Sequence, residues 1–207
     1  MPVAVKICGI TRVEDALAAA HAGAHALGFI FHPPSPRNID VPRAQAIVRA
    51  LPPFITTVGV FVDPDRAFVQ AVIKEIRLGA LQFHGDEDPV FCGGFGMPYM
   101  KAVRVRRDLD LLQCASIFRA AQALLLDAFV PGSHGGTGQT FDWSLIPPAL
   151  PVPVVLSGGL DAANVATAIR HVRPWAVDVS SGVEIEKGIK DAAKIAAFMR
   201  GVRDADV

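Results

Sequence analysis

The sequence has few cysteines and no excess of charge of either sign. Its three cysteines, Cys8, Cys92 and Cys114, are widely spaced and form no CxxC pair. Such a set suits neither a disulfide framework nor a zinc site, and it is typical of a protein in a reducing cytosol. The 20 basic and 20 acidic residues cancel, and no basic stripe indicates a nucleic-acid partner. We therefore expect any anionic ligand to be held by local groups.

Long apolar runs are also missing. No segment reaches the roughly 18 apolar residues that a membrane span requires, and the first residues lack the layout of a signal peptide. Apolar residues make up 51% of the 207 residues, which argues against disorder. No long linker rich in proline, glycine and serine divides the chain. We expect a cytoplasmic protein without a membrane anchor, folded as a single domain over residues 1–207.

The sequence does contain an eightfold alternation of strand and helix patterns. The predicted strands are Val3–Cys8, His25–Phe31, Thr57–Val62, Ala80–Phe83, Met97–Val105, Ala123–Asp127, Pro153–Ser157 and Ala176–Val179. Several are almost entirely apolar, which indicates a parallel sheet buried on both faces. Eight strand–helix units in this length predict an α/β fold, a (β/α)8 TIM barrel. A doubly wound open sheet, which would need fewer strands, is the alternative.

Apolar residues at helical spacing predict helices between these strands. They cover Val13–Ala22, Pro42–Leu51, Arg66–Ile76, Leu109–Ala121, Ala162–His171 and Asp191–Met199. Two connections give weaker patterns. Asp88–Gly96 contains three glycines, which are poor in a helix interior. The segment near Trp143–Ile146 is short and is followed at once by two prolines.

Four polar side chains stand where predicted strands end: Cys8, His84, Asp127 and Ser180. The carboxyl ends of the strands form the catalytic face of a barrel, so we expect these residues to share one site. Successive side chains point to opposite faces of a strand, and the ammonium of a lysine that faced the helices would be hard to pair. We therefore place Lys6 and Cys8 inside the barrel.

The same alternation groups Gln82 with His84 and Asp178 with Ser180. Each polar residue also has a purely structural explanation. A free cysteine is often a small buried hydrophobe, and His84 could be a hydrogen-bonded core histidine. Asp127 could cap a turn, although a lone carboxylate that ends an apolar strand is costly unless it is paired or functional. The histidines have no metal-ligand spacing.

Three loops are candidates for ligand binding. Arg37 follows a stiff proline-rich loop, and its guanidinium fork suits a carboxylate or a phosphate, although a solvated loop arginine is the simpler explanation. The loops Ser157–Gly159 and Ser180–Gly182 follow the last two strands, where barrels often bind phosphate through backbone N–H groups. The glycine-rich segment Ser133–Gly138 is a candidate lid.

Taken together, these motifs resemble the phosphoribosylanthranilate isomerase family of tryptophan biosynthesis. The matching segments are Lys6–Thr11, Gly28–Phe31 with Ser35–Arg37, Val58–Val62, Leu81–Gly85, Leu126–Asp127, Gly135–Gly138 with Phe141–Trp143, Leu156–Leu160 with Asn164–Val165, and Val177–Glu184 with Gly188 and Lys190–Asp191. They span nearly the whole chain in the expected order. The stretch Phe91–Gly96 is the least similar part.

The resemblance implies an intramolecular oxidoreductase, an aldose–ketose isomerase. It would convert N-(5′-phosphoribosyl)anthranilate to 1-(2-carboxyphenylamino)-1-deoxyribulose 5-phosphate by an Amadori rearrangement, with no metal or organic cofactor. The resemblance assigns Cys8 as the general base and Asp127 as the general acid. It further assigns Arg37 to the anthranilate carboxylate.

The remaining expected substrate-binding residues are His84, Gly158, Gly159, Asp178, Ser180, Ser181 and Gly182. Barrel closure would also bring Lys6 beside Asp178 below the active site. We expect the Lys6 ammonium to favour the Cys8 thiolate.

Two other functions fit part of the pattern. A related isomerase of the histidine pathway would bind two phosphates, but only the C-terminal half of this chain shows phosphate-binding loops. A non-catalytic phosphate-ligand binding protein would have no need of both Cys8 and Asp127. The expected partner is thus a small phosphorylated molecule, not nucleic acid or membrane, and the assembly is expected to be a monomer or a homodimer.

Overall fold

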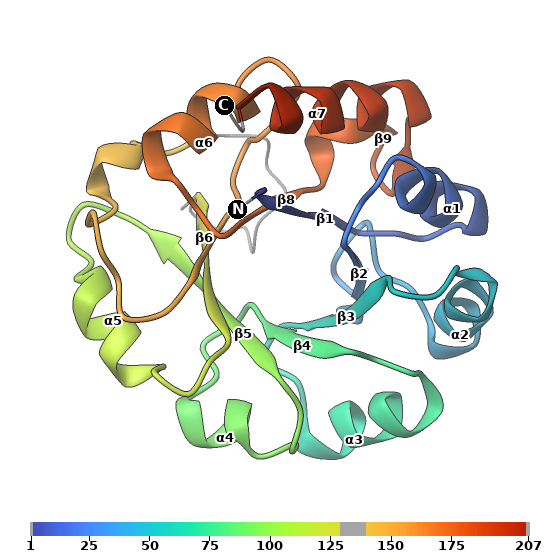
Figure 1. Ribbon diagram of the computed structural model, residues 1–207. Helices are drawn as coiled ribbons and strands as arrows, with labels where there is room; N and C mark the ends of the chain where they lie inside the picture. The colour runs from blue at the N-terminus through green and yellow to red at the C-terminus, as the bar shows by residue number, and fades with distance from the viewer. Residues whose placement is uncertain (1, 129–139, 206–207) are drawn as a thin grey trace.

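Eight parallel strands form a closed barrel, with helices around its outside (Figure 1). The structure is a computed structural model and describes residues 2–128 and 140–205. The strands follow one another around the barrel in chain order, and β8 pairs with β1 to close it. The predicted TIM barrel is confirmed. Among the described residues, no helix combines the length and apolarity needed to cross a membrane.

The observed strands match the predicted ranges to within one or two residues at each end. They are β1 (Ala4–Cys8), β2 (Ala26–Ile30), β3 (Thr56–Phe61), β4 (Ala80–Phe83), β5 (Tyr99–Val105), β6 (Ala123–Ala128), β7 (Val154–Leu156) and β8 (Ala176–Val179). Prolines account for two late starts. β5 and β7 begin directly after Pro98 and Pro153, which have no N–H to donate to a neighbouring strand.

The helices differ from the prediction mainly in length. They are α1 (Val13–His21), α2 (Val41–Ala50), α3 (Arg66–Glu75), α4 (Pro89–Gly93), α5 (Leu111–Ile117), α6 (Val165–Val172) and α7 (Ala192–Ala205). Aspartates start four of them, because their side chains accept backbone N–H groups of the first turn. These are Asp40, Asp88, Asp110 and Asp191. α4 is the shortest and ends at its first glycine. The connection before β7 holds only a 3₁₀ turn, η1 (Trp143–Leu145), within its described part.

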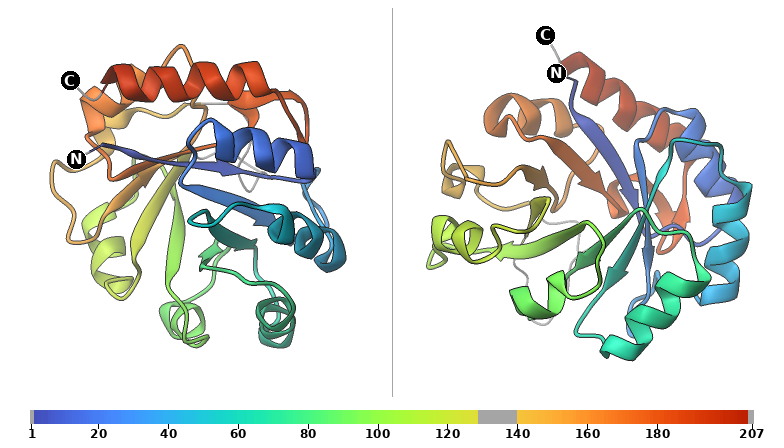
Figure 2. Two further views of the ribbon diagram at one scale, coloured as in Figure 1. Left: turned by 45° about the vertical axis from the view of Figure 1, so that its right-hand side comes forward. Right: turned by 60° about the horizontal axis from the view of Figure 1, so that its bottom comes forward.

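Among the described residues, a short hairpin after β8 is an addition that the sequence patterns did not predict. The 3₁₀ turn η2 (Ser181–Val183) leads into β9 (Glu184–Glu186), which pairs antiparallel with β10 (Ile189–Lys190). α7 then packs beside α1, so the two ends of the chain lie together on one side of the barrel (Figure 2). The hairpin is important because it carries Glu184 and Lys190 toward the end of β1.

The core has an aromatic outer layer and a smaller inner layer. Phe29, Phe61 and Phe83 are fully buried between the strands and the helices. The Phe83 ring lies beside four other aromatic rings, with centroid distances of 5.7–6.2 Å. They belong to Phe61, Phe91, Phe95 and Tyr99. Inside the barrel the residues are mostly small or aliphatic, such as Ala102, Leu125, Val155 and Ala176. This inner layer supports the polar residues at the strand ends.

We expect Phe83→Ala to lower the free energy of unfolding by about 3–5 kcal/mol, because it leaves a cavity between sheet and helices. Val90→Ala is the control: the Val90 side chain is 82% exposed on α4, next to Phe91, so little should change. Urea titration of both variants measures the effect. Equal stability of the two variants would contradict this description of the outer core.

Candidate active site

The predicted site residues come together around one cavity at the carboxyl ends of the strands. The cavity measures about 740 Å³, its open mouth included. Its lining includes Cys8, Arg37, His84, Asp127, Gly158, Gly159, Asp178, Ser180 and Ser181. Gly182 is not part of this lining, although it follows Ser181 in the chain. Residues of seven strands or their following loops therefore converge, as expected for the catalytic face of a barrel.

Cys8 ends β1 and is 5% exposed. Glycine at position 28 of β2 makes room for it, because a Cβ there would lie 2.7 Å from the Cys8 Sγ and 3.1 Å from the Lys6 Cε. Burial raises the pKa of the Cys8 thiol, and the Lys6 ammonium lowers it but does not outweigh burial. Lys6 therefore favours the Cys8 thiolate as expected, yet the net effect of the surroundings is to raise the pKa of the thiol.

Lys6 and Asp178 form the ion pair that was predicted from side-chain alternation and barrel closure. They are in register across the β1–β8 closure, and the Lys6 Nζ lies 2.7 Å from the Asp178 Oδ1. Burial lowers the pKa of Lys6, but the Asp178 carboxylate more than compensates, and the net shift is upward. The other oxygen of Asp178 accepts a hydrogen bond of 3.4 Å from the Ser157 hydroxyl. Asp178 is thus already engaged by protein groups at the floor of the cavity.

Asp127 is the penultimate residue of β6 and is held on both carboxylate oxygens. Its Oδ1 accepts the Ala128 N–H at 2.9 Å, and its Oδ2 lies 3.2 Å from the His84 Nε2. Gly158, at φ 86°, packs against this group, and a Cβ there would come within 2.7 Å of the Ala128 nitrogen. His84 also contacts Gln82 through its Nδ1, at 3.0 Å. His84 is therefore both a hydrogen-bonded buried histidine and part of the cavity wall.

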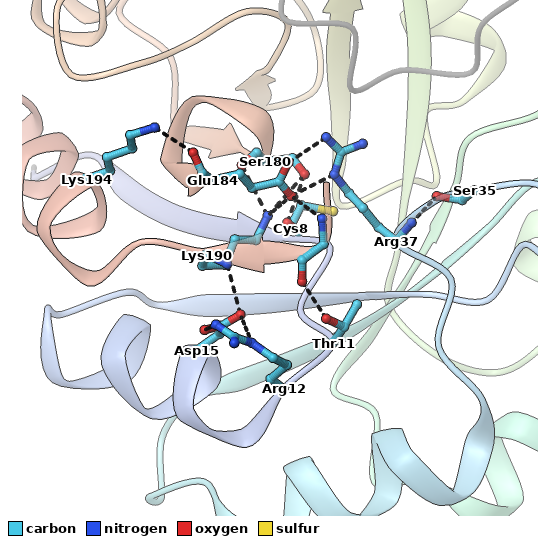
Figure 3. A network of polar contacts seen from close by, with 11 residues as sticks. Cys8, Thr11, Arg12, Asp15, Ser35, Arg37, Ser180, Glu184, Lys190 and Lys194 are labelled. Atoms are coloured by element: carbon cyan, nitrogen blue, oxygen red, sulfur yellow. Dashed lines mark hydrogen bonds and ion pairs between the residues drawn. The ribbon is translucent and has the colours of Figure 1, made fainter. Parts of the chain in front are cut away.

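Arg37 is paired with a carboxylate of the protein itself. Its Nε and Nη2 lie 2.8 and 2.7 Å from the two carboxylate oxygens of Glu184, in a buried bidentate contact (Figure 3). Among the residues that the structure describes, no acceptor contacts the Arg37 Nη1. The guanidinium can therefore offer one remaining nitrogen to a ligand while Glu184 holds the other edge.

Lys190 connects this pair to the end of β1. Its Nζ lies 2.8 Å from the Glu184 Oε1 and 3.1 Å from the Ser180 carbonyl, and the Ser180 hydroxyl donates to the Cys8 carbonyl at 3.0 Å. Burial lowers the pKa of Lys190, although Glu184 opposes the shift. The network in Figure 3 thereby joins the hairpin, the loop after β8 and the residue that ends β1.

The loops after β7 and β8 lie against each other through their backbones. A Cβ on Gly182 would collide with the Leu160 carbonyl oxygen, so only glycine fits there. Asn164 braces the first loop, because its Nδ2 donates to the Gly159 carbonyl at 2.9 Å. Backbone N–H groups in such close glycine-rich loops can bind a phosphate group. The predicted lid Ser133–Gly138 lies outside the described residues.

Sequence reasoning gave no role to three residues of this site: Gln82, Glu184 and Lys190. The strand phase placed Gln82 beside His84 but did not show which atoms meet. Glu184 and Lys190 stood within a family-like segment, but their approach to Arg37 depends on the hairpin. Across residues 2–128 and 140–205, no cluster of three or more His, Cys, Asp or Glu residues is arranged to hold a metal ion.

Comparison with known proteins shows the family. The model of the family described as N-(5'phosphoribosyl)anthranilate (PRA) isomerase matches residues 5–201. The chain belongs to this family. The isomerase of Nitrosospira multiformis is 60% identical over 98% of this chain and 97% of its own length. That of Thiobacillus denitrificans is 61% identical over 96% and 97%.

Solved isomerase structures share the fold. The Thermotoga maritima phosphoribosylanthranilate isomerase superposes with a TM-score of 0.90 at 42% identity, covering 98% of this chain and 99% of that one. Another isomerase structure, with a TM-score of 0.87 at 40% identity and the same coverage, holds reduced 1-(o-carboxyphenylamino)-1-deoxyribulose 5-phosphate. The resemblance to this isomerase family is therefore confirmed.

We expect Glu184→Gln to lower the free energy of unfolding by about 3–5 kcal/mol, because Arg37 and Lys190 would stay buried without a counter-charge. Asp108→Asn is the control, since it removes a partner of Arg106 from an ion pair whose side chains are 51% and 73% exposed. Urea titration compares the two. A loss no larger in Glu184→Gln than in the control would contradict the structural role of Glu184.

Proposed function

We propose that the chain catalyses the reaction for which its family is named. It would isomerise N-(5′-phosphoribosyl)anthranilate to 1-(2-carboxyphenylamino)-1-deoxyribulose 5-phosphate in tryptophan biosynthesis. The observation that carries this proposal is the placement of one thiol, Cys8, and one carboxyl group, Asp127, on the wall of the same cavity. They lie at the carboxyl ends of β1 and β6, two strands that are separated by β7 and β8. A substrate between them would meet a base and an acid from different sides.

Asp127 acts first, as the general acid. Its carboxyl group gives a proton to the ring oxygen of the furanose, the bond from that oxygen to C1′ breaks, and the anilino nitrogen lone pair forms the C1′=N bond of an iminium ion. Asp127 is left as a carboxylate, which the donors around it stabilise.

Cys8 acts second, as the general base. The thiolate removes the proton from C2′, and the electrons of that C–H bond form the C1′=C2′ double bond of an enolamine while the iminium nitrogen becomes neutral. The enolamine then loses the proton of the C2′ hydroxyl and gains one at C1′, which gives the ketone. No net proton is consumed in the isomerisation, and the chemistry requires only an acid and a base.

The two charged ends of the substrate would be bound at separate places. Nη1 of Arg37 would contact the anthranilate carboxylate, while Glu184 keeps the guanidinium fixed. The backbone of Gly158, Gly159 and the Ser180–Gly182 loop would bind the phosphate group. The site thus suits a small phosphorylated molecule.

We infer a monomeric or homodimeric cytoplasmic enzyme. A Thermotoga maritima relative is described as dimeric and has been converted to monomers. Light scattering would give the assembly state of this chain.

The test is the loss of anthranilate-type fluorescence when purified protein meets freshly made phosphoribosylanthranilate in the presence of EDTA. We expect rapid decay with the wild type. Cys8→Ser and Asp127→Asn should each lower kcat by at least about 100-fold, the usual contribution of a general acid or base. Cys114→Ser and Asp108→Asn are the matched controls and should behave as the wild type. No decay above the spontaneous rate would exclude the proposed activity.

The pH dependence tests the role of Cys8 as base. We expect kcat/KM to rise with pH as the thiol ionises, through a pKa that burial has raised. Because Lys6 lowers the pKa of Cys8, Lys6→Met should move this rise to higher pH. The double variant Lys6→Met/Asp178→Asn should move it less, since Asp178 raises the same pKa and its unpaired charge is removed.

Lys74→Met, on the surface helix α3, is the control and should leave the profile unchanged. An identical profile in the wild type and Lys6→Met would show that Lys6 does not tune the base.

A further inference from the structure

Gln82, His84 and Asp127 form a continuous chain of hydrogen bonds in the cavity wall. The Gln82 Nε2 lies 3.0 Å from the His84 Nδ1, and the His84 Nε2 lies 3.2 Å from the Asp127 Oδ2. Gln82 and His84 are two residues apart and share the inner face of β4, whereas Asp127 comes from β6. All three side chains are at least nine-tenths buried.

The contact between Gln82 and His84 is a hydrogen bond in only one of the two neutral tautomers of the imidazole. An amide nitrogen only donates, so the contact requires an Nδ1 that accepts, which is the tautomer with its proton on Nε2. Nε2–H then donates to Asp127. In the opposite tautomer, the Nε2 lone pair would face the carboxylate and the Gln82 N–H would meet another N–H. The amide of Gln82 therefore selects one of the two neutral tautomers.

The amide reduces the stability of the fold at this position. The Gln82 Oε1 is buried and contacts no donor within the described parts of the chain. Its neighbours in register are Val60 on β3 and Met100 on β5, which offer no hydrogen bond through their side chains. A buried acceptor without a partner is destabilising. Methionine, of the same length, would remove this acceptor, but it would also remove the donor to the His84 Nδ1. The amide at position 82 is thus better explained by the active site than by packing.

We propose that Gln82 is a positioning residue that keeps the proton of His84 on Nε2, so that His84 and the Ala128 N–H stabilise the carboxylate that Asp127 becomes. The proposal rests on the role of Asp127 as the acid. As the Asp127 proton moves to the ring oxygen, negative charge develops between two donors that are already in place. Donors fixed before charge develops are the most effective kind of electrostatic catalysis.

Other charged groups surround this chain of hydrogen bonds without forming part of it. Cys8 and the Lys6–Asp178 pair belong to β1 and β8, and Arg37 and His32 line the cavity from the loop after β2. Arg104 of β5 is in register with Asp127 and pairs with Asp86. Within residues 2–128 and 140–205, Asp127 is the ionisable side chain hydrogen-bonded to His84.

Kinetics of Gln82→Met provide the first test. We expect kcat to fall by about 10-fold, the effect of one hydrogen bond to a charged group, with KM unchanged because no substrate contact is removed. The melting temperature should change little, since the variant removes one unpaired buried acceptor, the Gln82 Oε1, and leaves the His84 Nδ1 without its donor. Gln113→Met, on the exposed face of α5, is the control and should match the wild type. A fall in kcat that accompanies a fall in melting temperature would indicate a structural role and overturn the proposal.

A double-mutant cycle separates the tautomer effect from a direct one. In His84→Gln, an amide Nε2 can donate to Asp127 whatever residue stands at position 82. Adding Gln82→Met to this variant should therefore change kcat little, although it lowers kcat in the wild-type background. Equal losses in both backgrounds would mean that Gln82 acts independently of His84 and would overturn the proposal.

The tautomer itself is visible by NMR of the ¹⁵N-labelled protein. We expect the His84 signals, assigned from their loss in His84→Gln, to show a protonated Nε2 in the wild type and a mixture of tautomers in Gln82→Met. A protonated Nδ1 in the wild type would overturn the proposal. This readout does not depend on activity. If Asp127→Asn were fully active, the proposed acid would be wrong even where the tautomer is as expected.

Discussion

The closure of the barrel between β1 and β8 is the constraint on which the site depends. It brings together residues that are 172 positions apart in the chain: Lys6 with Asp178, and the Cys8 carbonyl with the Ser180 hydroxyl. The first contact places a compensated ion pair beneath the cavity, and the second ties the loop after β8 to the strand that carries the thiol. Without this closure, the thiol and its neighbouring ammonium on β1 would lie apart from Asp178 and the loop after β8.

Most charged groups of the site are neutralised by the protein before any ligand binds. Glu184 is shared by Arg37 and Lys190, and Asp178 is matched by Lys6. A buried charge without a partner is very costly, so these pairs define the few arrangements that the loops can adopt. The same environment opposes ionisation of Cys8, because burial raises the pKa of its thiol. The burial that keeps the site rigid thus also disfavours the thiolate form of Cys8.

Individual residues show how far prediction from the sequence could reach. The alternation of side chains along a strand correctly placed Lys6 and Cys8 inside the barrel and Gln82 on the same face as His84, because this two-residue repeat is local. It could not show that the Arg37 fork is occupied by Glu184, since that partner is 147 residues away on a hairpin with little local signal. Nor could it show which atoms of Gln82 and His84 meet. The weak fourth helix was predicted correctly in kind, but its glycines end it earlier than expected.

The sequence by itself determined the alternation of strands and helices, the barrel class and the order of the polar residues at the strand ends. These properties follow from local periodicity. Prolines and glycines only shorten some of the elements at their ends. The tertiary structure decided which charges pair, which thiol and carboxyl groups share a cavity, and which polar atoms of Gln82, His84 and Asp127 meet. Such properties depend on distances between strands that are far apart in the chain, and barrel closure sets those distances only after the whole chain has folded.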